Sequence, residues 1–223
     1  MKQFVEAALF DFNGTMFDDD DINNISWGEI IDEVCGQELY LSNDDSKYIG
    51  AKDSIFLKYL FSLTGKEISD EEADEWAEKK EIKYRHYCTE WKRDKLRKGL
   101  EDVLNYIKEN NIPLAMATNS IKSNVDFYFK NVQLDRWFDR KYVVYDDGNH
   151  FNKITMYREC ARRLGVNIEN CIIFEDSPGS VRNAIEAGCP RIIRISEDNM
   201  LNYPEIKQNI RDFSELDYSC FEL

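Results

Sequence analysis

The sequence predicts an α/β protein in which a Rossmann-like, doubly wound parallel sheet carries an inserted all-helical cap domain. Apolar runs that end in small polar or acidic residues recur at 4–15, 113–120 and 171–176. Buried parallel strands have this nearly continuous apolar character, and helical patterns between the later runs favour parallel pairing through crossovers. Only helical periodicity fills the stretch between the first two runs. We therefore expect an α/β core at 1–16 and 98–223 and a cap at 17–97.

Composition and net charge limit the classes of partner that the protein can bind. The chain of 223 residues is 43% hydrophobic and 32% charged, as in ordinary globular proteins. Its formal charge of -14 opposes nucleic-acid or membrane-surface binding, since such polyanions would be repelled on average. A small anionic substrate remains compatible if a metal ion and a few lysines reverse the local field. We therefore expect a small-molecule partner, no nucleic acid and no membrane.

Cysteine usage and the N-terminus predict a cytoplasmic location. The six cysteines show no C-x-x-C spacing, so neither a zinc site nor a disulfide framework is indicated. Reduced, mostly buried thiols are typical of cytosolic proteins. No basic-apolar leader and no apolar run of membrane-spanning length occur in the sequence. We expect a monomer.

The first element is a strand that ends in reactive side chains. Residues 4–10 are largely apolar and run directly into Asp11-Phe12-Asn13-Gly14-Thr15. Ligands bind at the carboxyl ends of strands in open α/β sheets, so Asp11 is a candidate reactive group. An acidic run at 18–21 then predicts a solvated loop that leads into the cap.

The insert is predicted to be helical. Apolar residues recur at three-to-four spacing over 22–34 and again over 55–63. Ser69, followed by three acidic residues, predicts the start of a further helix that contains Trp76 and Tyr84.

The second half alternates strands with helices. Predicted helices cover 100–109, 121–132, 154–164 and the stretch that follows Gly179 and ends at Ala187, and predicted strands cover 113–120, 142–145, 171–174 and 191–195. Asn110-Asn111 marks a turn, and Gly188 caps the last helix. A final strand is expected near Ile210.

Three strand ends together predict a metal site. The first carries Asp11 and Asn13, the second carries Thr118, Asn119 and Ser120, and the third carries Glu175 and Asp176. Parallel strands place these ends at one edge of the sheet, where converging carboxylates can hold a hard cation through oxygen ligands. Mg²⁺ is the expected ion.

These motifs resemble the haloacid dehalogenase superfamily. Asp-Phe-Asn-Gly-Thr at 11–15 is similar to its Asp-x-Asp-Gly-Thr signature, and Phe-Glu-Asp-Ser-Pro-Gly at 174–179 is similar to its acidic fourth motif. Most members are phosphatases and phosphomutases that use the first Asp as nucleophile and Mg²⁺ as cofactor. With the helical insert, the likeness to the β-phosphoglucomutase-like branch covers nearly the whole chain.

The resemblance implies roles for individual residues. Asp11 would form an aspartyl-phosphate, and Thr118, with Ser120 as second choice, would bind phosphate beside Asn119. The expected metal ligands are an Asp11 carboxylate oxygen, the main-chain carbonyl of Asn13 and Asp176, with Glu175 as a further ligand or a neighbour of the ligands. The third motif, usually Gly-Lys-Pro-x-Pro-Asp, is altered to Gly-Asn-His-Phe-Asn-Lys at 148–153. Lys153 is the candidate for the cation that faces phosphate, against the alternative of a surface lysine at a helix start.

Asn13 is the main departure from the family pattern. The family's acid at this position protonates the leaving oxygen and later activates water, a role worth about 10²–10⁴-fold in rate. An amide forms hydrogen bonds but does not titrate. The metal site should persist while both chemical steps slow.

Three functions fit this departure. The first is a slow phosphatase, or one restricted to good leaving groups. The second resembles phosphonoacetaldehyde hydrolases, which lack this acid and form an imine on a cap lysine, for which Lys52 is the candidate. The third is a catalytically impaired phosphate-binding protein.

Cap lysines are the candidates for substrate choice. Lys52, Lys79, Lys80 and Lys83 resemble positions near which relatives select substrates, but lysines interleaved with acids usually form a solvated face. Only Lys52 and Lys83 are therefore retained as substrate residues.

Overall fold

The computed structural model describes residues 4–36, 53–148, 152–198 and 200–222. The chain divides into two compact units. The core unit comprises residues 1–18 and 95–223, and the helical unit comprises residues 19–94. The sequence placed these divisions at 16/17 and 97/98.

The core unit is built on a parallel sheet of six described strands in the order β3-β2-β1-β4-β5-β6. The strands are β1 (Ala7–Phe10), β2 (Leu114–Ile121), β3 (Val143–Asp146), β4 (Cys171–Glu175), β5 (Ile192–Ile195) and β6 (Ile206–Ile210). This is the predicted doubly wound, Rossmann-like sheet. Because β2 and β4 flank β1 on opposite sides, the strand order reverses at β1, and such a switch point is where open sheets bind ligands.

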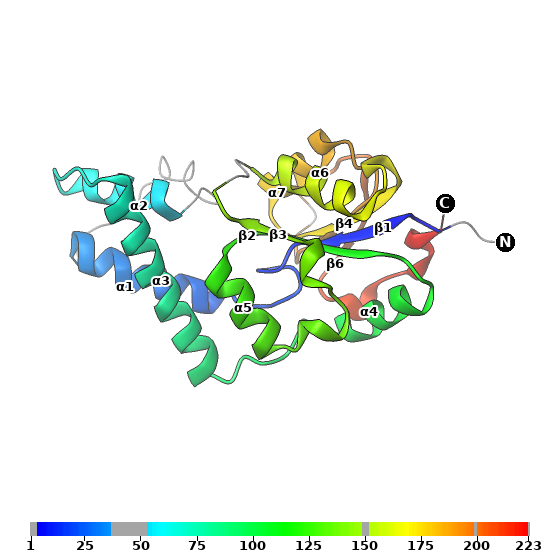
Figure 1. The fold of residues 1–223 in the computed structure, drawn as a ribbon, viewed down its shortest axis with the longest axis horizontal. Helices are drawn as coiled ribbons and strands as arrows, with labels where there is room; N and C mark the ends of the chain where they lie inside the picture. Colours follow the sequence, from blue (N-terminus) through cyan, green and yellow to red (C-terminus); the bar gives the residue numbers. More distant parts are fainter. Residues whose placement is uncertain (1–3, 37–52, 149–151, 199, 223) are drawn as a thin grey trace. The chain divides into compact units, whose positions relative to one another are not determined.

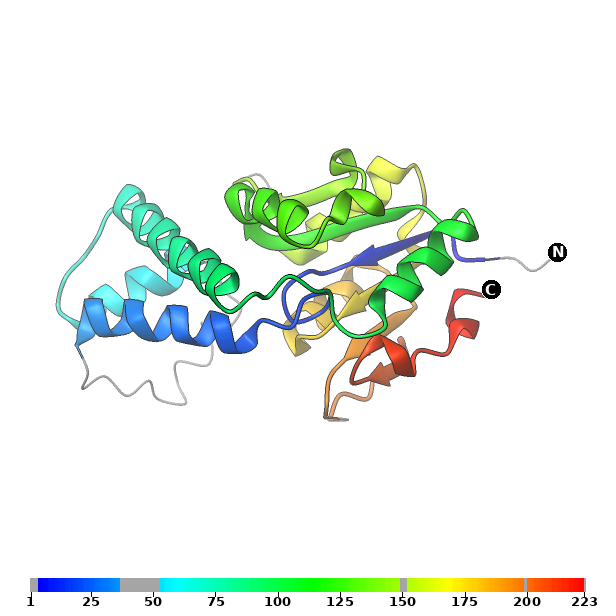
Figure 2. The same ribbon diagram turned by 90° about the horizontal axis from the view of Figure 1, so that it is seen from below.

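Helices cover both faces of the sheet (Figure 1). The core helices are α4 (Leu100–Glu109), α5 (Lys122–Asn131), α6 (Lys153–Leu164) and α7 (Pro178–Ala187). Helices α6 and α7 lie on one face, and α4 and α5 lie on the other. Figure 2 shows the segment after β6 returning beside α4. That segment includes short 3-10 turns at Phe213–Glu215 and Tyr218–Phe221.

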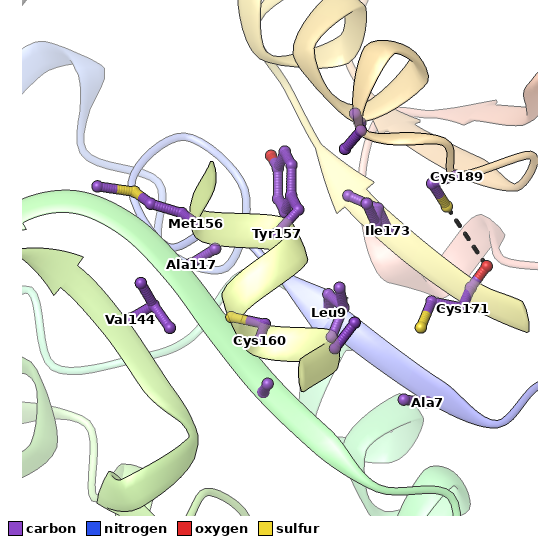
Figure 3. Packing of buried hydrophobic residues seen from close by; sticks show 14 of the residues in the cluster. Ala7, Leu9, Ala117, Val144, Met156, Tyr157, Cys160, Cys171, Ile173 and Cys189 are labelled. Atoms are coloured by element: carbon purple, nitrogen blue, oxygen red, sulfur yellow. Dashed lines mark hydrogen bonds between the residues drawn. The ribbon is translucent and has the colours of Figure 1, made fainter. Parts of the chain in front are cut away.

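Successive residues of β1 supply opposite sides of the core. Ala7 and Leu9 join the apolar cluster under α6 and α7, where Figure 3 shows Leu9 near Ile173 and Cys160. Phe10 points to the other face and stacks on Phe174 with 4.3 Å between ring centroids. Two-residue alternation on a doubly covered sheet explains why the whole strand is buried.

The helical unit contains α1 (Asp20–Cys35), α2 (Asp53–Leu63) and α3 (Asp70–Glu90). Its core is Ile30, Leu57 and Leu60, with Trp27 and Trp76 packed against it. The predicted start of α3 carries a capping box: the Ser69 Oγ accepts from Glu72 N–H at 3.1 Å, and Glu72 accepts from Ser69 N–H at 2.8 Å. In the part of the chain that is described, no helix has the length and apolar character needed to cross a membrane.

Candidate active site

Strand register brings the predicted site residues to one level of the sheet. Phe10 of β1 pairs with Met116 of β2 and with Phe174 of β4. The next residues along these strands are therefore neighbours, and Asp11 N–H donates to Phe174 O at 3.1 Å. The Asp11 side chain is buried, with 7% of the residue exposed. Asp11 and Glu175 thus lie side by side at the carboxyl edge.

Lys153 lies between these two carboxylates. It begins α6, where Asn152 caps the helix by accepting from Thr155 N–H at 3.1 Å. Its Nζ donates to Asp11 Oδ1, to Ala117 O at 2.7 Å and to Glu175 Oε1 at 3.1 Å. The residue is 3% exposed, so the alternative of a surface lysine is excluded.

Glu175 receives further donors. The buried Tyr157 hydroxyl donates to Glu175 Oε1, and Asp176 N–H donates to Oε2 at 3.1 Å. We call Asp11, Lys153, Tyr157, Glu175 and Asp176 the charged half of the site. Its members come from the ends of β1 and β4 and from one face of α6.

Local chain geometry fixes Asp176. Gly14 has a φ of 73°, and a Cβ there would lie 2.5 Å from Asp176 Oδ2. Only glycine therefore permits this close approach. Thr15 Oγ1 donates to Asp176 Oδ1 at 3.0 Å, and α7 starts two residues later with Ser177 as its cap and Pro178 in its first turn.

The charged half fits a divalent cation. Ligand oxygens of Asp11, Glu175 and Asp176 lie within 4.8 Å of one another, and Lys153 supplies the one ammonium in contact with them among the described residues. Burial raises the pKa of Asp11 to about 7 although Lys153 opposes the shift. Burial and repulsion from Glu175 and Asp11 also raise the pKa of Asp176 well above its usual range. Burial and mutual repulsion thus oppose ionisation of these carboxyl groups, and a hard cation bound through their oxygens would offset both effects.

The pKa of Lys153 is also raised, but here burial opposes the shift and attraction to its neighbours is the cause. Burial by itself lowers it, but attraction to Asp11 and Glu175 outweighs burial and raises the pKa above its ordinary range. Lys153 therefore keeps its positive charge beside Asp11.

A second group of residues, with uncharged side chains, is joined by hydrogen bonds around Asn13. Asn13 Oδ1 accepts from Ser120 Oγ at 2.8 Å, and its Nδ2 donates to the Tyr128 hydroxyl at 3.0 Å. Asn124 Nδ2 also donates to that hydroxyl at 3.3 Å. We call Asn13, Ser120, Asn124 and Tyr128 the neutral half. The Tyr128 ring stacks on Phe12 at 3.9 Å between centroids, which holds the hydroxyl next to the strand end.

The three predicted phosphate residues have different surroundings. Thr118 is buried, and its Oγ1 accepts from Ser120 N–H at 3.1 Å. Asn119 is exposed, whereas Ser120 is half-buried and joined to Asn13. The structure brings Thr118 and Ser120 to the strand end that carries Asp11.

Comparison with known proteins identifies the family. The sequence model of the haloacid dehalogenase-like hydrolases matches residues 5–188. The chain belongs to this family. A structure of an HAD hydrolase, family IA, variant 3, from Entamoeba histolytica HM-1:IMSS is 31% identical, covers 97% of both chains and superimposes with a TM-score of 0.83.

Two further relatives of this haloacid dehalogenase-like hydrolase carry phosphatase names. YhcW of Bacillus subtilis (strain 168), provisionally named a phosphatase, is 26% identical over 190 residues, which are 85% of this chain and 83% of YhcW. The phosphorylated carbohydrates phosphatase of Thermotoga maritima is 30% identical over 96 residues, which are 42% of this chain and 44% of that protein.

The predicted cap lysines of the hydrolase are less informative. Lys52 lies outside the described residues. Lys83 is ion-paired with Glu29 and lies 3.1 Å from Glu33. Lys80 was assigned to a solvated face, and this was wrong: it is 4% exposed, with Glu81 at 2.9 Å and Asp53 at 3.5 Å. Helical packing against Trp27, whose ring lies 5.2 Å from the ammonium, buries this lysine despite its acidic neighbours.

Sequence reasoning missed the two tyrosines of the site. Tyr157 follows Lys153 by four residues and Tyr128 follows Asn124 by four, so each pair shares one face of a helix. That spacing was available in the sequence. A helical tyrosine is far more often a core residue, and only the hydroxyl contacts distinguish these two.

Proposed function

We propose that the protein is a Mg²⁺-dependent phosphatase that hydrolyses a small phosphorylated sugar or related metabolite through an aspartyl-phosphate on Asp11. The observation that carries the proposal is the buried Asp11 carboxylate held by Lys153 within 4.8 Å of Glu175 and Asp176 oxygens. The sugar class is suggested by the printed name of the Thermotoga maritima relative. Asp11, Asp176 and the main-chain carbonyl of Asn13 would hold the ion, with Glu175 as ligand or adjacent counter-charge.

The chain's own residues account for the first chemical step. An Asp11 oxygen attacks phosphorus, a new P–O bond forms, and the P–O bond to the leaving alcohol breaks with its electron pair on that oxygen. Lys153 and the hydroxyl of Thr118 or Ser120 would stabilise charge on the transferring phosphoryl oxygens. Mg²⁺, when bound, supplies further neutralisation of phosphate charge.

In the second step water attacks the phosphorylated Asp11 and releases inorganic phosphate, which regenerates the carboxylate. In the family, an acid at the position of Asn13 donates and accepts a proton in the two steps. The Asn13 amide does not titrate near neutral pH and so transfers no proton. Solvent must then supply and remove the protons. We therefore expect slow turnover, fastest with leaving groups that need no protonation.

A panel of phosphorylated sugars and p-nitrophenyl phosphate tests the proposal with wild-type, Asn13→Asp and Asp11→Ala proteins. Turnover by the first two that is lost in Asp11→Ala would support it. If neither wild type nor Asn13→Asp exceeds Asp11→Ala on any substrate, the hydrolase proposal fails. Saturable binding of phosphate with Mg²⁺ but without turnover would instead favour a phosphate-binding protein.

Lys83 of the helical unit remains a candidate for substrate choice. Its two glutamate partners, Glu29 and Glu33, would have to release it before it could bind phosphate. A Lys83→Met variant with unchanged KM across the sugar panel would remove this residue from the proposal.

A further inference from the structure

Tyr157 is a fully buried residue of α6 whose hydroxyl reaches the charged half of the site. Its exposed fraction is 0%, and Figure 3 shows its ring within the apolar layer above the sheet. A buried hydroxyl costs free energy unless it is hydrogen-bonded, and this one donates to Glu175 Oε1. Apolar packing therefore fixes the ring, and the ring fixes the direction of the O–H bond.

Glu175 accepts three described hydrogen bonds. Oε1 receives Lys153 and Tyr157, and Oε2 receives Asp176 N–H. The residue is 0% exposed, so water contributes little to its orientation. These three donors determine which way the carboxylate faces.

Lys153 depends on that orientation. An ammonium has three donors, and those of Lys153 go to Asp11, Ala117 O and Glu175. If Glu175 turned away, one of the three acceptors that aim Lys153 at Asp11 would be lost.

We propose that Tyr157 is a positioning residue that acts through Glu175. Its hydroxyl holds the Glu175 carboxylate toward Lys153 and the Asp176 amide, so that Glu175 serves first as the counter-charge of Lys153. Lys153 is thereby kept beside Asp11, while Asp11 and Asp176 are left to ligate the cation. This inference rests on the proposed function, because it assumes that the same carboxylates bind Mg²⁺.

Calorimetric titration of metal-free protein with Mg²⁺ alone tests the inference. Tyr157→Phe keeps the ring and removes the hydroxyl, and we expect it to weaken the Kd for Mg²⁺ about tenfold, as outer-shell changes commonly do. With p-nitrophenyl phosphate at saturating Mg²⁺, kcat should fall while KM stays near its wild-type value. Tyr142→Phe is the matched control, because Tyr142 packs against the same apolar cluster but does not contact Glu175 in the described contacts.

A double-mutant cycle separates positioning from a general loss of packing. Glu175→Gln should itself weaken Mg²⁺ binding, and adding Tyr157→Phe to it should then change the Kd little. Equal effects of Tyr157→Phe in both backgrounds would overturn the inference, as would a wild-type Kd for Tyr157→Phe. If Tyr157→Phe does not fold, Glu175→Gln alone decides, since an unchanged Mg²⁺ Kd would remove any role for the Glu175 charge.

The same titration keeps the two proposals apart. Wild-type protein that binds no Mg²⁺ would overturn the metal-dependent function and this inference with it. Wild-type binding that Tyr157→Phe leaves unchanged would overturn the inference alone.

Discussion

The charged half and the neutral half flank the same strand end but are built from opposite chemistry. Asp11 faces a buried ammonium and further carboxylates, whereas Asn13, two residues later, exchanges neutral hydrogen bonds with Ser120 and Tyr128. The charged half has what is needed to bind a cation and a phosphoryl group. In the neutral half, hydrogen bonds orient the Asn13 amide, but this amide does not act as an acid or a base. The difference teaches that binding and proton transfer are separable parts of one site.

The largest effect on the rate is expected when the Asp11 carboxylate of the charged half is replaced by an amide. Asp11→Asn removes the nucleophile, so the rate should fall by ~10⁴-fold or more, as for other essential nucleophiles. Initial rates on the best substrate of the panel measure this. Asp135→Asn, which removes an exposed acid from the same unit, is the control and should leave the rate unchanged. Activity that survives in Asp11→Asn would show that another group attacks phosphorus.

The converse change gives the neutral half a carboxyl. Asn13→Asp should raise kcat by about 10²–10⁴-fold, the usual contribution of a positioned acid–base group. Asn124→Asp is the matched control, because it places a carboxyl beside the same Tyr128 hydroxyl but away from the strand end. Peptide mapping should confirm that position 13 of the wild type is still an amide. Equal rates for wild type and Asn13→Asp would mean that the neutral half has no role in proton transfer.

Removing the Lys153 ammonium from the charged half should affect phosphate binding and Mg²⁺ binding differently. Lys153→Met should lower kcat/KM by about 10²–10³-fold, because one preorganised donor to phosphate is lost. Binding of Mg²⁺ at pH 8 should change much less than phosphate binding, because loss of the ammonium removes a repulsion of the cation and at the same time removes one of the three donors to Glu175. Inhibition by inorganic phosphate and calorimetry measure the two effects, with the exposed Lys141→Met as control. A parallel loss of Mg²⁺ and phosphate binding would contradict this separation.

The pH dependence of metal binding should come from the charged half. The ordinary pKa of Asp11 is 3.8, and burial raises it to about 7 in the metal-free protein. Below pH 7 the Asp11 side chain must release a proton to bind Mg²⁺, so its contribution should raise the affinity by up to about tenfold per pH unit between pH 5 and 7, in addition to the contribution of Asp176, whose pKa is also raised.

The raised pKa of Asp11 also predicts how the free energy of unfolding of the metal-free protein depends on pH. Between about pH 4 and 7 the folded Asp11 holds a proton that the unfolded chain releases, so its contribution to stability is lost as pH rises through this window. Added Mg²⁺ should restore stability above pH 7. Thermal unfolding at each pH measures this, and Asp11→Asn should remove most of the dependence. A metal affinity that is flat from pH 5 to 8 would contradict the assignment.

The smallest effect is expected from the hydroxyl of the neutral half. Tyr128→Phe keeps the stacking on Phe12 but removes hydrogen bonds, and it should lower the free energy of unfolding by about 1 kcal/mol. Its effect on kcat should be far smaller than that of Lys153→Met. Chemical denaturation and initial rates measure both quantities. A loss of activity comparable to Lys153→Met would show that the Tyr128 hydroxyl takes part in catalysis.

Much of the fold was predictable because it depends on local pattern. The helix predicted over 100–109 has these bounds in the structure, the helices predicted over 121–132 and 154–164 differ by one residue at one or both ends, and the last core helix ends at Ala187 as predicted. Strand ends were predictable for the same reason, since Asp11 and Glu175 follow apolar runs directly. The position of Lys153 was harder to predict, because the motif around it is altered and only packing shows whether a helix-start lysine faces inward.

The sequence by itself determined the sheet, the helical insert and the set of strand-end oxygens. Apolar runs must be buried, and parallel pairing of the resulting strands places all their carboxyl ends at one edge of the sheet. The tertiary structure decided which side chains reach Asp11. It placed the Lys153 ammonium and the Tyr157 hydroxyl on one carboxylate, enclosed Asn13 between Ser120 and Tyr128, and buried Lys80. These outcomes depend on the distances between elements far apart in the chain, which periodicity does not encode.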